Sequence, residues 1–388
     1  STTPKNVDGV YQIGTAAELT WFASAVNDGT AETQNAVLTA NIDLNNVEWK
    51  PIGTTRKKYT GTFNGQNNRV TGLYISTPDL MAGLFGFADT GSKIENLTVA
   101  GNISISNFNQ PNKSCMIGGI VAVSRGDIIN CHNEVNISLT DYACKTLNVG
   151  GICGSIGLNG TVNSIVGCTN VGNISCSVNY GSTDHFAYAG GIAGRLNFNP
   201  KVDSCKNTGS VSVALTGFGT GCAGGITNLS YVNEVDINNC YNTGSVQVTK
   251  PDSIGDVTLC AGAVVGYSPI DENTATICYP TNCYYLSGSA SAGMNNANGQ
   301  AVTDETSGIS AKTADELKST EFLASLNAAA PITNYTVTWI AGADGYPTIK
   351  HSGNGEPQNT APHLKSGVAA SATASVPVNT AYTLDLST

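Results

Sequence analysis

The chain has 388 residues, of which 40% are hydrophobic and only 12% are charged, and its formal net charge at pH 7 is −10. So few cations cannot neutralise a phosphate backbone, which excludes nucleic acid and anionic membrane surfaces as partners. No apolar run approaches the roughly 20 residues of a membrane-spanning helix, so we expect no membrane insertion in this segment.

The N-terminal part predicts a helical cap. Thr15 and Glu18 have the spacing of a capping box, and apolar residues follow at helical spacing: Leu19, Phe22, Ala23 and Val26. An amphipathic helix of this kind can cover the open end of a stack of coils. We therefore expect residues 10–45 to form an N-terminal cap; a partner-binding helix is the alternative.

Residues 46–75 predict strands that lead into the coils. The stretch 59–65 is expected to be a strand that ends in a tight Asn64-Gly65 turn, with 69–75 as the returning strand. Just before it, Arg56-Lys57-Lys58 is the only basic cluster. We interpret this cluster as a solvated loop tip, with anion binding as the alternative.

One phrase recurs through the middle of the chain. Its copies begin at Cys131, Cys168, Cys205 and Cys240, which are 37, 37 and 35 residues apart (168−131, 205−168, 240−205), and a Gly-Gly-Ile step precedes each copy. A fixed period of this size indicates a solenoid. The phrase is rich in Gly, Asn, Ser, Thr and Val, and its apolar residues alternate, as in Val211-Ser212-Val213, which favours short strands. The predicted fold is an all-β, right-handed parallel β-helix with short helical caps at both ends and coils at about 46–286.

Stacking of the coils predicts a role for each position of the phrase. The cysteines form an inward column, and one asparagine per coil forms an amide ladder: Asn133, Asn170, Asn207 and Asn242. The glycines that follow are expected to adopt a positive φ angle: Gly172, Gly209 and Gly244. The core positions are Ile137, Ile174, Val211 and Val246.

The chain contains 12 cysteines. Cys283 shares the phase of the four repeat cysteines, and Cys222 and Cys260 share a second phase. Packing therefore explains these residues, and we expect mostly free, buried thiols. No Cys-x-x-Cys pair occurs, so a zinc site is not predicted, and no metal or cofactor is expected.

The coils also resemble a known family. Gly83-Leu84-Phe85-Gly86, followed by Ile94–Ile103, resembles the GLUG motif of bacterial surface proteins, and the Gly-Gly-Ile units look like diverged copies of it. The resemblance covers roughly residues 10–350. It implies a large exported protein of the adhesin-like kind, or the non-catalytic part of an IgA-specific metallo-endopeptidase.

Loops are expected to leave the coils at 108–114, 141–147, 179–186 and 249–257, and in repeat proteins such insertions often form the binding surface. Aromatic rings beside polar groups suit sugars or peptides. The candidate binding residues in or beside these loops are Tyr142, Tyr180, Asp184, His185, Phe186, Tyr188 and Phe218. The alternative is that these rings only cover the coil edges.

After Tyr284-Tyr285 the period stops, and residues 287–311 are predicted to be a loop. Thr313 then begins a helix, and strands follow at 335–339 and 345–349. We expect residues 312–350 to cap the other end of the stack. Residues 351–362 resemble a linker, and 363–388 resemble the start of an immunoglobulin-like or cadherin-like module, so the chain is expected to be part of a longer protein.

Catalytic signatures are absent from the sequence, which lacks His-Glu-x-x-His in particular. Four residues before the repeat cysteine stand Asp127, Ser164, Lys201 and Asp236. With two coils between them, the two aspartates are about 14 Å apart at about 4.8 Å per coil, wider than the roughly 5–9.5 Å of glycosidases. No catalytic residue is predicted.

The sequence therefore favours a non-enzymatic, adhesin-like module, extracellular or on a bacterial cell surface, that binds a glycan or a host or matrix protein. A polysaccharide-degrading lyase or hydrolase on the β-helix and a structural stalk are the alternatives.

Overall fold

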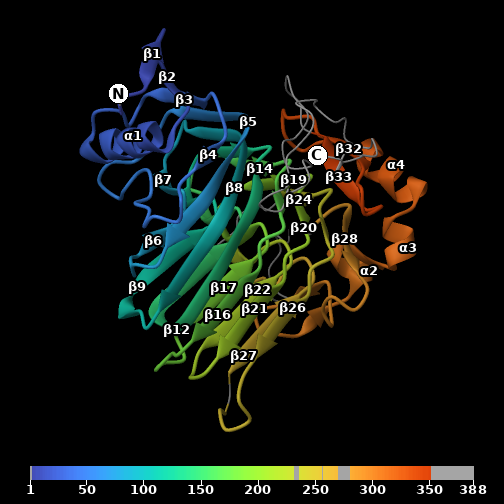
Figure 1. Cartoon of the computed structure of the whole chain (residues 1–388). Helices are drawn as coiled ribbons and strands as arrows, with labels where there is room; N and C mark the ends of the chain where they lie inside the picture. Colours follow the sequence, from blue (N-terminus) through green and yellow to red (C-terminus); the bar gives the residue numbers. More distant parts are fainter. Residues whose placement is uncertain (1, 231–235, 256, 270–279, 351–388) are drawn as a thin grey trace, which may run out of the picture.

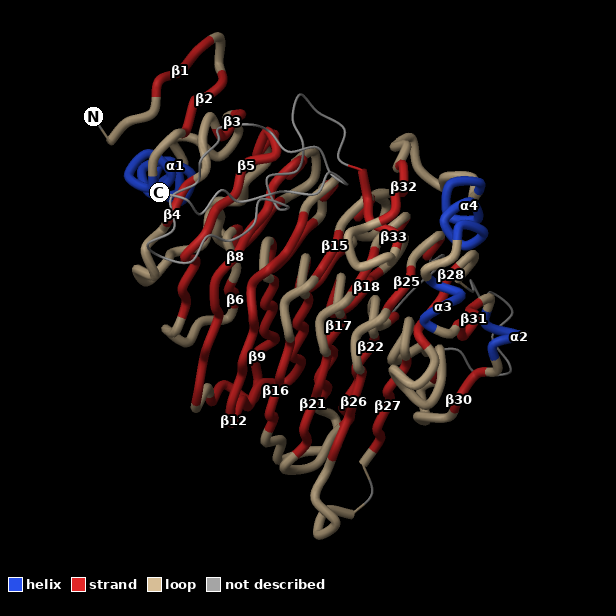
Figure 2. The backbone as a smooth tube through the Cα atoms, turned by 45° about the vertical axis from the view of Figure 1, so that its right-hand side comes forward, coloured by secondary structure: helices blue, strands red, loops and turns tan. Residues whose placement is uncertain are grey.

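The computed structural model describes residues 2–230, 236–255, 257–269 and 280–350 (Figures 1 and 2). They form a parallel β-solenoid of about six turns, built mostly of strands, which confirms the predicted fold class. Each coil contributes to three parallel sheets, named here face A, face B and face C. The predicted linker and immunoglobulin-like start, and Cys278, lie outside the described residues.

The strands of face A are β8 (Lys93–Ser106), β11 (Asp127–Ile129), β12 (His132–Gly150), β14 (Ser164–Val166), β15 (Thr169–Asn170), β16 (Ile174–Val178), β19 (Lys201–Asp203), β20 (Lys206–Asn207), β21 (Val211–Leu215), β24 (Asp236–Asn238), β25 (Tyr241–Asn242), β26 (Val246–Thr249), β28 (Cys283–Leu286) and β31 (Ile309–Lys312). Face B contains β7 (Phe85–Ala88), β10 (Val121–Ser124), β13 (Cys153–Ile156), β18 (Ala193–Asn197) and β23 (Leu229–Ser230). Face C contains β6 (Met81–Ala82), β9 (Asn109–Gly118), the end of β12, β17 (Phe186–Gly190), β22 (Thr220–Gly224) and β27 (Thr258–Gly262).

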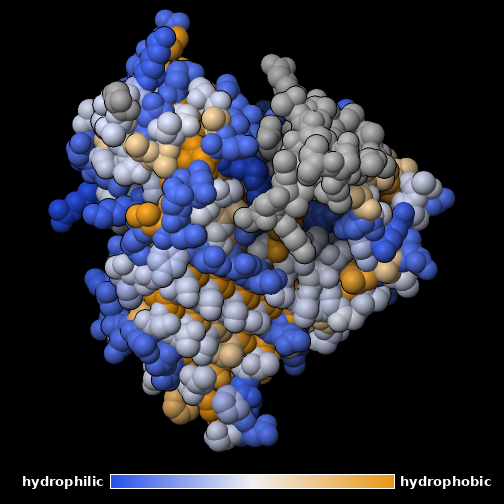
Figure 3. All heavy atoms as spheres, viewed as in Figure 1, coloured by the Kyte–Doolittle hydropathy of each residue, from blue (hydrophilic) through white to orange (hydrophobic). Residues whose placement is uncertain are grey.

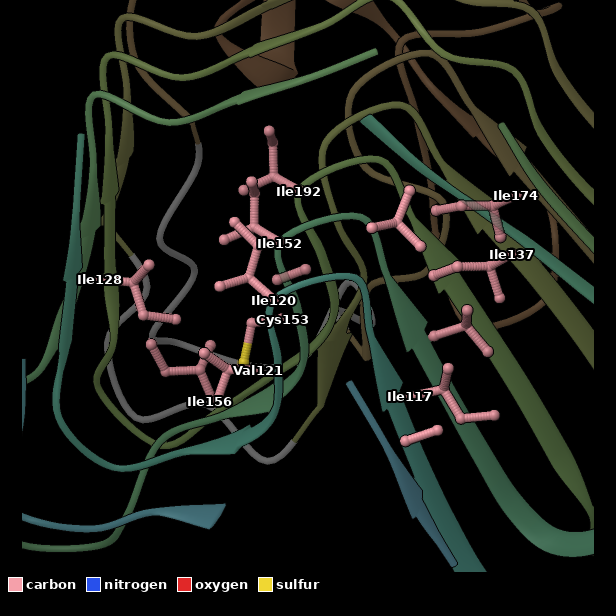
Figure 4. Close-up of a cluster of buried hydrophobic side chains, with 14 of the residues drawn as sticks. Ile117, Ile120, Val121, Ile128, Ile137, Ile152, Cys153, Ile156, Ile174 and Ile192 are labelled. Atoms are coloured by element: carbon pink, nitrogen blue, oxygen red, sulfur yellow. The ribbon is translucent and has the colours of Figure 1, made fainter. Parts of the chain in front are cut away.

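The core consists of columns of like residues. The isoleucines of three Gly-Gly-Ile steps, Ile120, Ile152 and Ile192, lie one above the other, and Ile137 lies beside Ile174 in register (Figure 4). All five side chains are at most 1% exposed. Burying one such side chain is worth roughly 1.5–3 kcal/mol, so the repeat of the apolar positions holds the coils together.

The predicted asparagine ladder is confirmed. Each Nδ2 donates to the Oδ1 of the next coil, at 2.7 Å from Asn133 to Asn170, 2.8 Å from Asn170 to Asn207 and 2.7 Å from Asn207 to Asn242. Each Nδ2 also donates to the carbonyl two residues later, as from Asn207 to Gly209 at 2.8 Å. The predicted cysteine column is present as well, and the eleven described cysteines are all free and buried.

The positive φ angle predicted for the glycines that follow the ladder asparagines was wrong. Gly172, Gly209 and Gly244 do not have a positive φ. A Cβ at each would lie 2.0 Å from a carbonyl oxygen of the preceding coil, so glycine is required there by close approach of two backbones. The left-handed corner is one residue before the repeat cysteine, for example at Asn130 (φ 53°) and Asn239 (φ 56°).

The N-terminal end is covered by α1 (Ala16–Asp28), as the sequence predicts. Thr15 accepts from the Glu18 amide, and Gly29 ends the helix with φ 89°. Phe22 lies edge-on to Tyr59 at 5.9 Å and beside Phe63 at 6.1 Å, inside the core of the first coil. Four strands precede the first full coil: β1 (Lys5–Val7), β2 (Val10–Ile13), β3 (Asn35–Leu38) and β4 (Ile42–Asp43).

The predicted hairpin at Asn64-Gly65 was wrong. Residues Thr62–Ile75 form one strand, β5, which runs parallel to β8 on one side and to β3 and β4 on the other. The left-handed residues Gln66 and Asn67 make a register shift instead of a reversal. The chain continues forward because β8 offers a parallel partner along the whole length of β5.

Residues 287–311 are not only a loop. They contain β29 (Met294–Asn295), β30 (Ala301–Val302), α2 (Asp304–Ser307) and the first part of β31, which pairs in parallel with β28. Ala292 and Met294 are buried. These residues thus complete one more, shortened coil after the sequence period has ended.

The C-terminal segment, residues 314–350, contains α3 (Ala314–Leu317), α4 (Thr320–Ala328), β32 (Thr338–Ala341) and β33 (Pro347–Lys350). The sequence predicts that it covers the end of the last coil, whereas the structure shows it against the outer side of face A. Its buried side chains pack around Tyr241, with Tyr284 beside them. It also reaches back along the solenoid, because Tyr335 Oη donates to Asp127 Oδ2 at 3.1 Å and the Ile332 amide donates to Asp203 Oδ2 at 2.9 Å.

Candidate functional site

Two of the predicted aromatic binding residues lie in the core. Tyr142 is 0% exposed and stacks on Phe108 at 4.6 Å, and Tyr180 is 1% exposed with its hydroxyl on the Phe186 carbonyl at 2.9 Å. The predicted loops 108–114 and 141–147 are parts of strands β9 and β12. The expected exposure of these two rings was therefore wrong: Tyr142 is an inward residue of β12, and Tyr180 points inward from the connection between β16 and β17.

Asp184, His185 and Phe218 do not share one environment. Asp184 is exposed and accepts from Ser182, whose hydrogen bond lowers the pKa of this carboxyl. His185 is buried and lies edge-on to Tyr180 at 5.3 Å. Phe218 is 50% exposed. The structure thus does not bring all seven predicted residues together in one site.

Phe186 and Tyr188 do lie together, on the outside of face C. They stack at 5.7 Å, Tyr267 lies edge-on to Tyr188 at 5.5 Å, and the Arg195 guanidinium lies over the Tyr188 ring at 5.5 Å. Cys222 and Cys260 complete this small cluster below the rings. Tyr188 is only 4% exposed and burial raises its pKa, so Phe186 and Tyr267, which are half-buried, are the rings of this cluster that a ligand can touch.

The charged groups at the predicted coil phase bond within the chain. Lys201 and Asp236 are in register and form an ion pair at 2.7 Å. Asp127 accepts from the Ser164 amide at 2.9 Å and from Tyr335. Asp203 is buried, which raises its pKa, and it accepts from Ile332, Ser204 and Asn238. Within residues 2–230, 236–255, 257–269 and 280–350, no three His, Cys, Asp or Glu side chains gather so that they could hold a metal ion.

Two grooves lie outside the coils. One, of about 710 Å³, separates α1 from residues 44–50 and has Leu44, Val47 and Trp49 on its apolar wall. The other, of about 590 Å³, lies between Tyr284 and the helices α3 and α4. Both lie beside the elements that cover the solenoid, and the second also includes Tyr284 of β28 and Lys312 of β31, which belong to the last coils.

One regular surface of the repeat, named here the polar face, is the part of face A that is formed by β8, β12, β16, β21 and β26. Its outward residues are Asn102, Ser104 and Ser106 of β8; Asn136, Ser138 and Thr140 of β12; Asn173, Ser175 and Ser177 at β16; Ser210, Ser212 and Ala214 at β21; and Ser245, Gln247 and Thr249 at β26. All of them are exposed or half-buried. The alternation of apolar and polar residues that creates this face is visible in the sequence. The match of its outward residues from coil to coil was not predicted.

The polar face is uncharged and ordered. None of its positions holds a charged side chain, and Figure 3 shows it as a broad, mostly pale area over β8 to β26. Asn136 Oδ1 accepts from the Asn173 amide at 2.9 Å, and Asn173 Oδ1 accepts from the Ser210 amide and hydroxyl, both at 3.0 Å. These bonds fix the amide side chains, so the face offers hydroxyl and amide groups in a regular array to a ligand.

No family model matches the chain. A protein of Evansella cellulosilytica described as a "Putative Gly-rich membrane protein" is 28% identical over 128 residues, which are 32% of this chain and 14% of the relative. This chain therefore matches only a small part of that relative's length.

Among solved structures, a Bacteroides ovatus protein described as a "putative immunoglobulin A1 protease" superposes with a TM-score of 0.57 at 21% identity, over 89% of this chain and 94% of the other. This likeness establishes a shared β-solenoid fold. In the part of the chain that the structure describes, no helix is both long and apolar enough to cross a membrane.

Proposed function

We propose that this chain is a non-enzymatic binding module of a bacterial surface protein, which holds a glycan or a host or matrix protein on the polar face. One observation carries the proposal: the outward side chains of five successive strands, nearly all Asn, Ser or Thr, are exposed or half-buried, with no charge among them. Hydroxyl and amide groups both donate and accept hydrogen bonds, so an array of them can bind a polar ligand without burying a charge.

The names of the two similar proteins and the GLUG resemblance agree with a place at the cell surface. The enzyme alternative requires carboxylates that are grouped and available, whereas Asp127, Asp203 and Asp236 each bond to other groups of the same chain. The stalk alternative requires no ligand at all. Of the predicted aromatic residues, Phe186 and Phe218 are exposed enough to add contacts at the border of a bound ligand.

The test is incubation of the pure protein with mucins, plant polysaccharides and matrix proteins, followed by size-exclusion chromatography of protein and products. Co-migration with an intact polymer or protein, without new short fragments, is the expected result. The appearance of new oligosaccharides would contradict the binding function and indicate an enzyme. If the protein neither cleaves nor co-migrates with any of these polymers or proteins, the structural-stalk alternative remains.

A further inference from the structure

We infer that the ligand of the polar face is an extended, neutral polysaccharide that lies across the strands, parallel to the axis of the solenoid; this inference rests on the proposed binding function. It specifies both the charge of the ligand and its shape. The argument has three parts: the absence of charge on the face, its period, and the order of its side chains.

The absence of charge selects a neutral ligand. Fifteen outward positions from Asn102 to Thr249 carry no Asp, Glu, Lys, Arg or His, although the border of the face holds Glu134, Asp141 and Lys250. An acidic polymer would lose its hydration on this surface without a cation to compensate, and the net charge of −10 would repel it. A neutral sugar loses only hydroxyl hydration, which the hydroxyls and amides of the face replace.

The period of the face selects a polymer. Parallel strands lie about 4.8 Å apart, and alternate residues of one strand are about 6.6 Å apart, so the outward groups form a lattice. Ser138, Ser175 and Ser212 are in register on successive coils and offer the same hydroxyl three times. A small molecule would use one or two of these groups. A chain of identical sugar units can repeat one weak contact along the solenoid, and the contacts then add up through a high effective concentration.

The order of the side chains lowers the cost of binding. The amides of Asn136 and Asn173 are fixed by hydrogen bonds to the following coil, and Ser212 Oγ donates to the Ile174 carbonyl at 3.4 Å. Exposed Asn and Ser side chains that are already held lose less conformational freedom when a ligand arrives. The strands that carry these side chains pair in parallel with their neighbours and lie side by side in Figure 2, so the groups form a continuous sheet across successive coils.

The test is depletion of the protein from solution by microcrystalline cellulose, chitin and insoluble mannan, beside soluble alginate and heparin in native affinity electrophoresis. Ser175→Glu places a charge in the middle of the polar face, and Gln110→Glu places the same charge on an exposed strand position of face C. Unchanged circular dichroism and thermal unfolding show that both variants fold. We expect saturable binding to one neutral polymer, weakened at least about 10-fold by Ser175→Glu, which corresponds to about 1.4 kcal/mol, and unchanged by Gln110→Glu.

Five outcomes would overturn the inference. Retention by alginate or heparin alone would show that the ligand is acidic, and equal binding by both variants would place the ligand elsewhere. Thermal hysteresis in ice growth, with no polymer bound, would assign the array to a crystal surface. If instead the chain binds only a matrix protein, the proposed function stands and this inference fails; if it binds nothing in either experiment, both fail.

Discussion

Glu134 lies on the outer side of face A between the side chains of Arg69 and His132. Arg69 donates to both of its oxygens, at 3.0 and 2.6 Å, and His132 Nε2 lies 3.3 Å from Oε1. Burial alone would raise the pKa of Glu134, but hydrogen bonds from His132 and Arg69, with their charges, lower it to about 2. A bidentate Arg–carboxylate pair is among the stronger charged contacts in proteins, so this carboxylate ties β5 to β12.

Glu134→Gln is expected to remove a pH-dependent part of the stability. The folded-state pKa of about 2 lies below the usual 4.5, so the stabilisation is complete above about pH 4.5 and is lost as the pH falls towards 2. Wild type should lose on the order of 2–3 kcal/mol more than the variant between these limits. Urea unfolding at about pH 6 and about pH 3 measures the difference. Parallel pH dependence of the two proteins would show that the ion pair does not stabilise the fold.

Asn207→Ala is expected to destabilise the fold by about 2–4 kcal/mol, because it removes three buried amide hydrogen bonds and leaves the Asn170 and Asn242 side chains with one partner fewer. Ser245→Ala, at an exposed position of the following coil, is the control and should change stability by less than about 0.5 kcal/mol. Chemical denaturation of the two variants measures both values. Equal stability would mean that the ladder contributes no net free energy.

The sequence predicted the asparagine ladder because residue type and period are both visible in it. It could not predict the partner of Glu134, since Arg69 is 65 residues away and lies outside the period of the phrase. The same holds for the candidate site. The sequence does not show that β12 continues from face A into face C, which buries Tyr142, or that the connection between β16 and β17 turns Tyr180 inward. The matching Ser and Asn side chains of the polar face are common surface residues, so the sequence alone does not mark them as a site.

At the scale of the coil, two columns of residues interlock. The second glycine of each Gly-Gly-Ile step lies against the ladder: a Cβ at Gly151 would be 2.4 Å from Asn170, and a Cβ at Gly191 would be 2.3 Å from Asn207 and 2.2 Å from the Gly225 carbonyl. Neither glycine has a positive φ. The corner is therefore narrow because the asparagine side chain fills it, and the two residue types depend on each other.

Gly191→Ala is expected to destabilise the protein by at least about 3 kcal/mol, since both contacts of the added methyl group are with fixed atoms. Gly181→Ala is the matched control, because nothing lies within 4 Å of its Cβ, and it should leave stability unchanged or raise it by about 0.4–1 kcal/mol. Thermal unfolding compares the two. Equal melting temperatures would contradict the steric account of the corner.

Helices and strands could be predicted where a coil repeats the preceding one or where local capping residues mark them. They could not be predicted where a feature occurs once in the chain and depends on a distant partner. Helix α1 was predicted correctly from its own capping residues. The turn at Asn64-Gly65 was not, because its local preference for a hairpin is outweighed by the parallel partner β8. That partner is more than 25 residues further along the chain, and no local pattern indicates it.

At the scale of the whole molecule, the C-terminal segment forms hydrogen bonds with several successive coils. Besides Tyr335 and Ile332, the Pro347 carbonyl accepts from Lys206 at 2.9 Å, and the Leu326 carbonyl accepts from Asn239 at 2.9 Å. Lys206 is 5% exposed, and burial lowers its pKa to about 8. A lysine in an outward position is normally solvated, so Lys206 does not indicate in the sequence that this part of face A is covered.

The buried apolar contacts between the segment and the coils are gathered in the cluster around Tyr241, so the protein is expected to contain two units of different stability. Trp339 is 2% exposed, and its ring lies 5.7 Å from that of Tyr241. Trp339→Ala should cost about 3–5 kcal/mol locally and release residues 314–350 while the coils stay folded. Hydrogen exchange followed by mass spectrometry is expected to show faster exchange in that segment and unchanged protection in β12, β16 and β21.

Trp21→Ala is the matched control for this experiment. Trp21 is a half-buried residue of α1 that packs against Tyr11 at the opposite end of the solenoid, so its removal should loosen the N-terminal cap and leave residues 314–350 protected. If Trp339→Ala instead accelerates exchange in β12, β16 and β21 as much as in the segment, the coils and the segment unfold as one cooperative unit. The hydrogen bonds that join this segment to Asp127, Asp203 and Asn239 would then contribute as much to the stability of the coils as the ladders inside them.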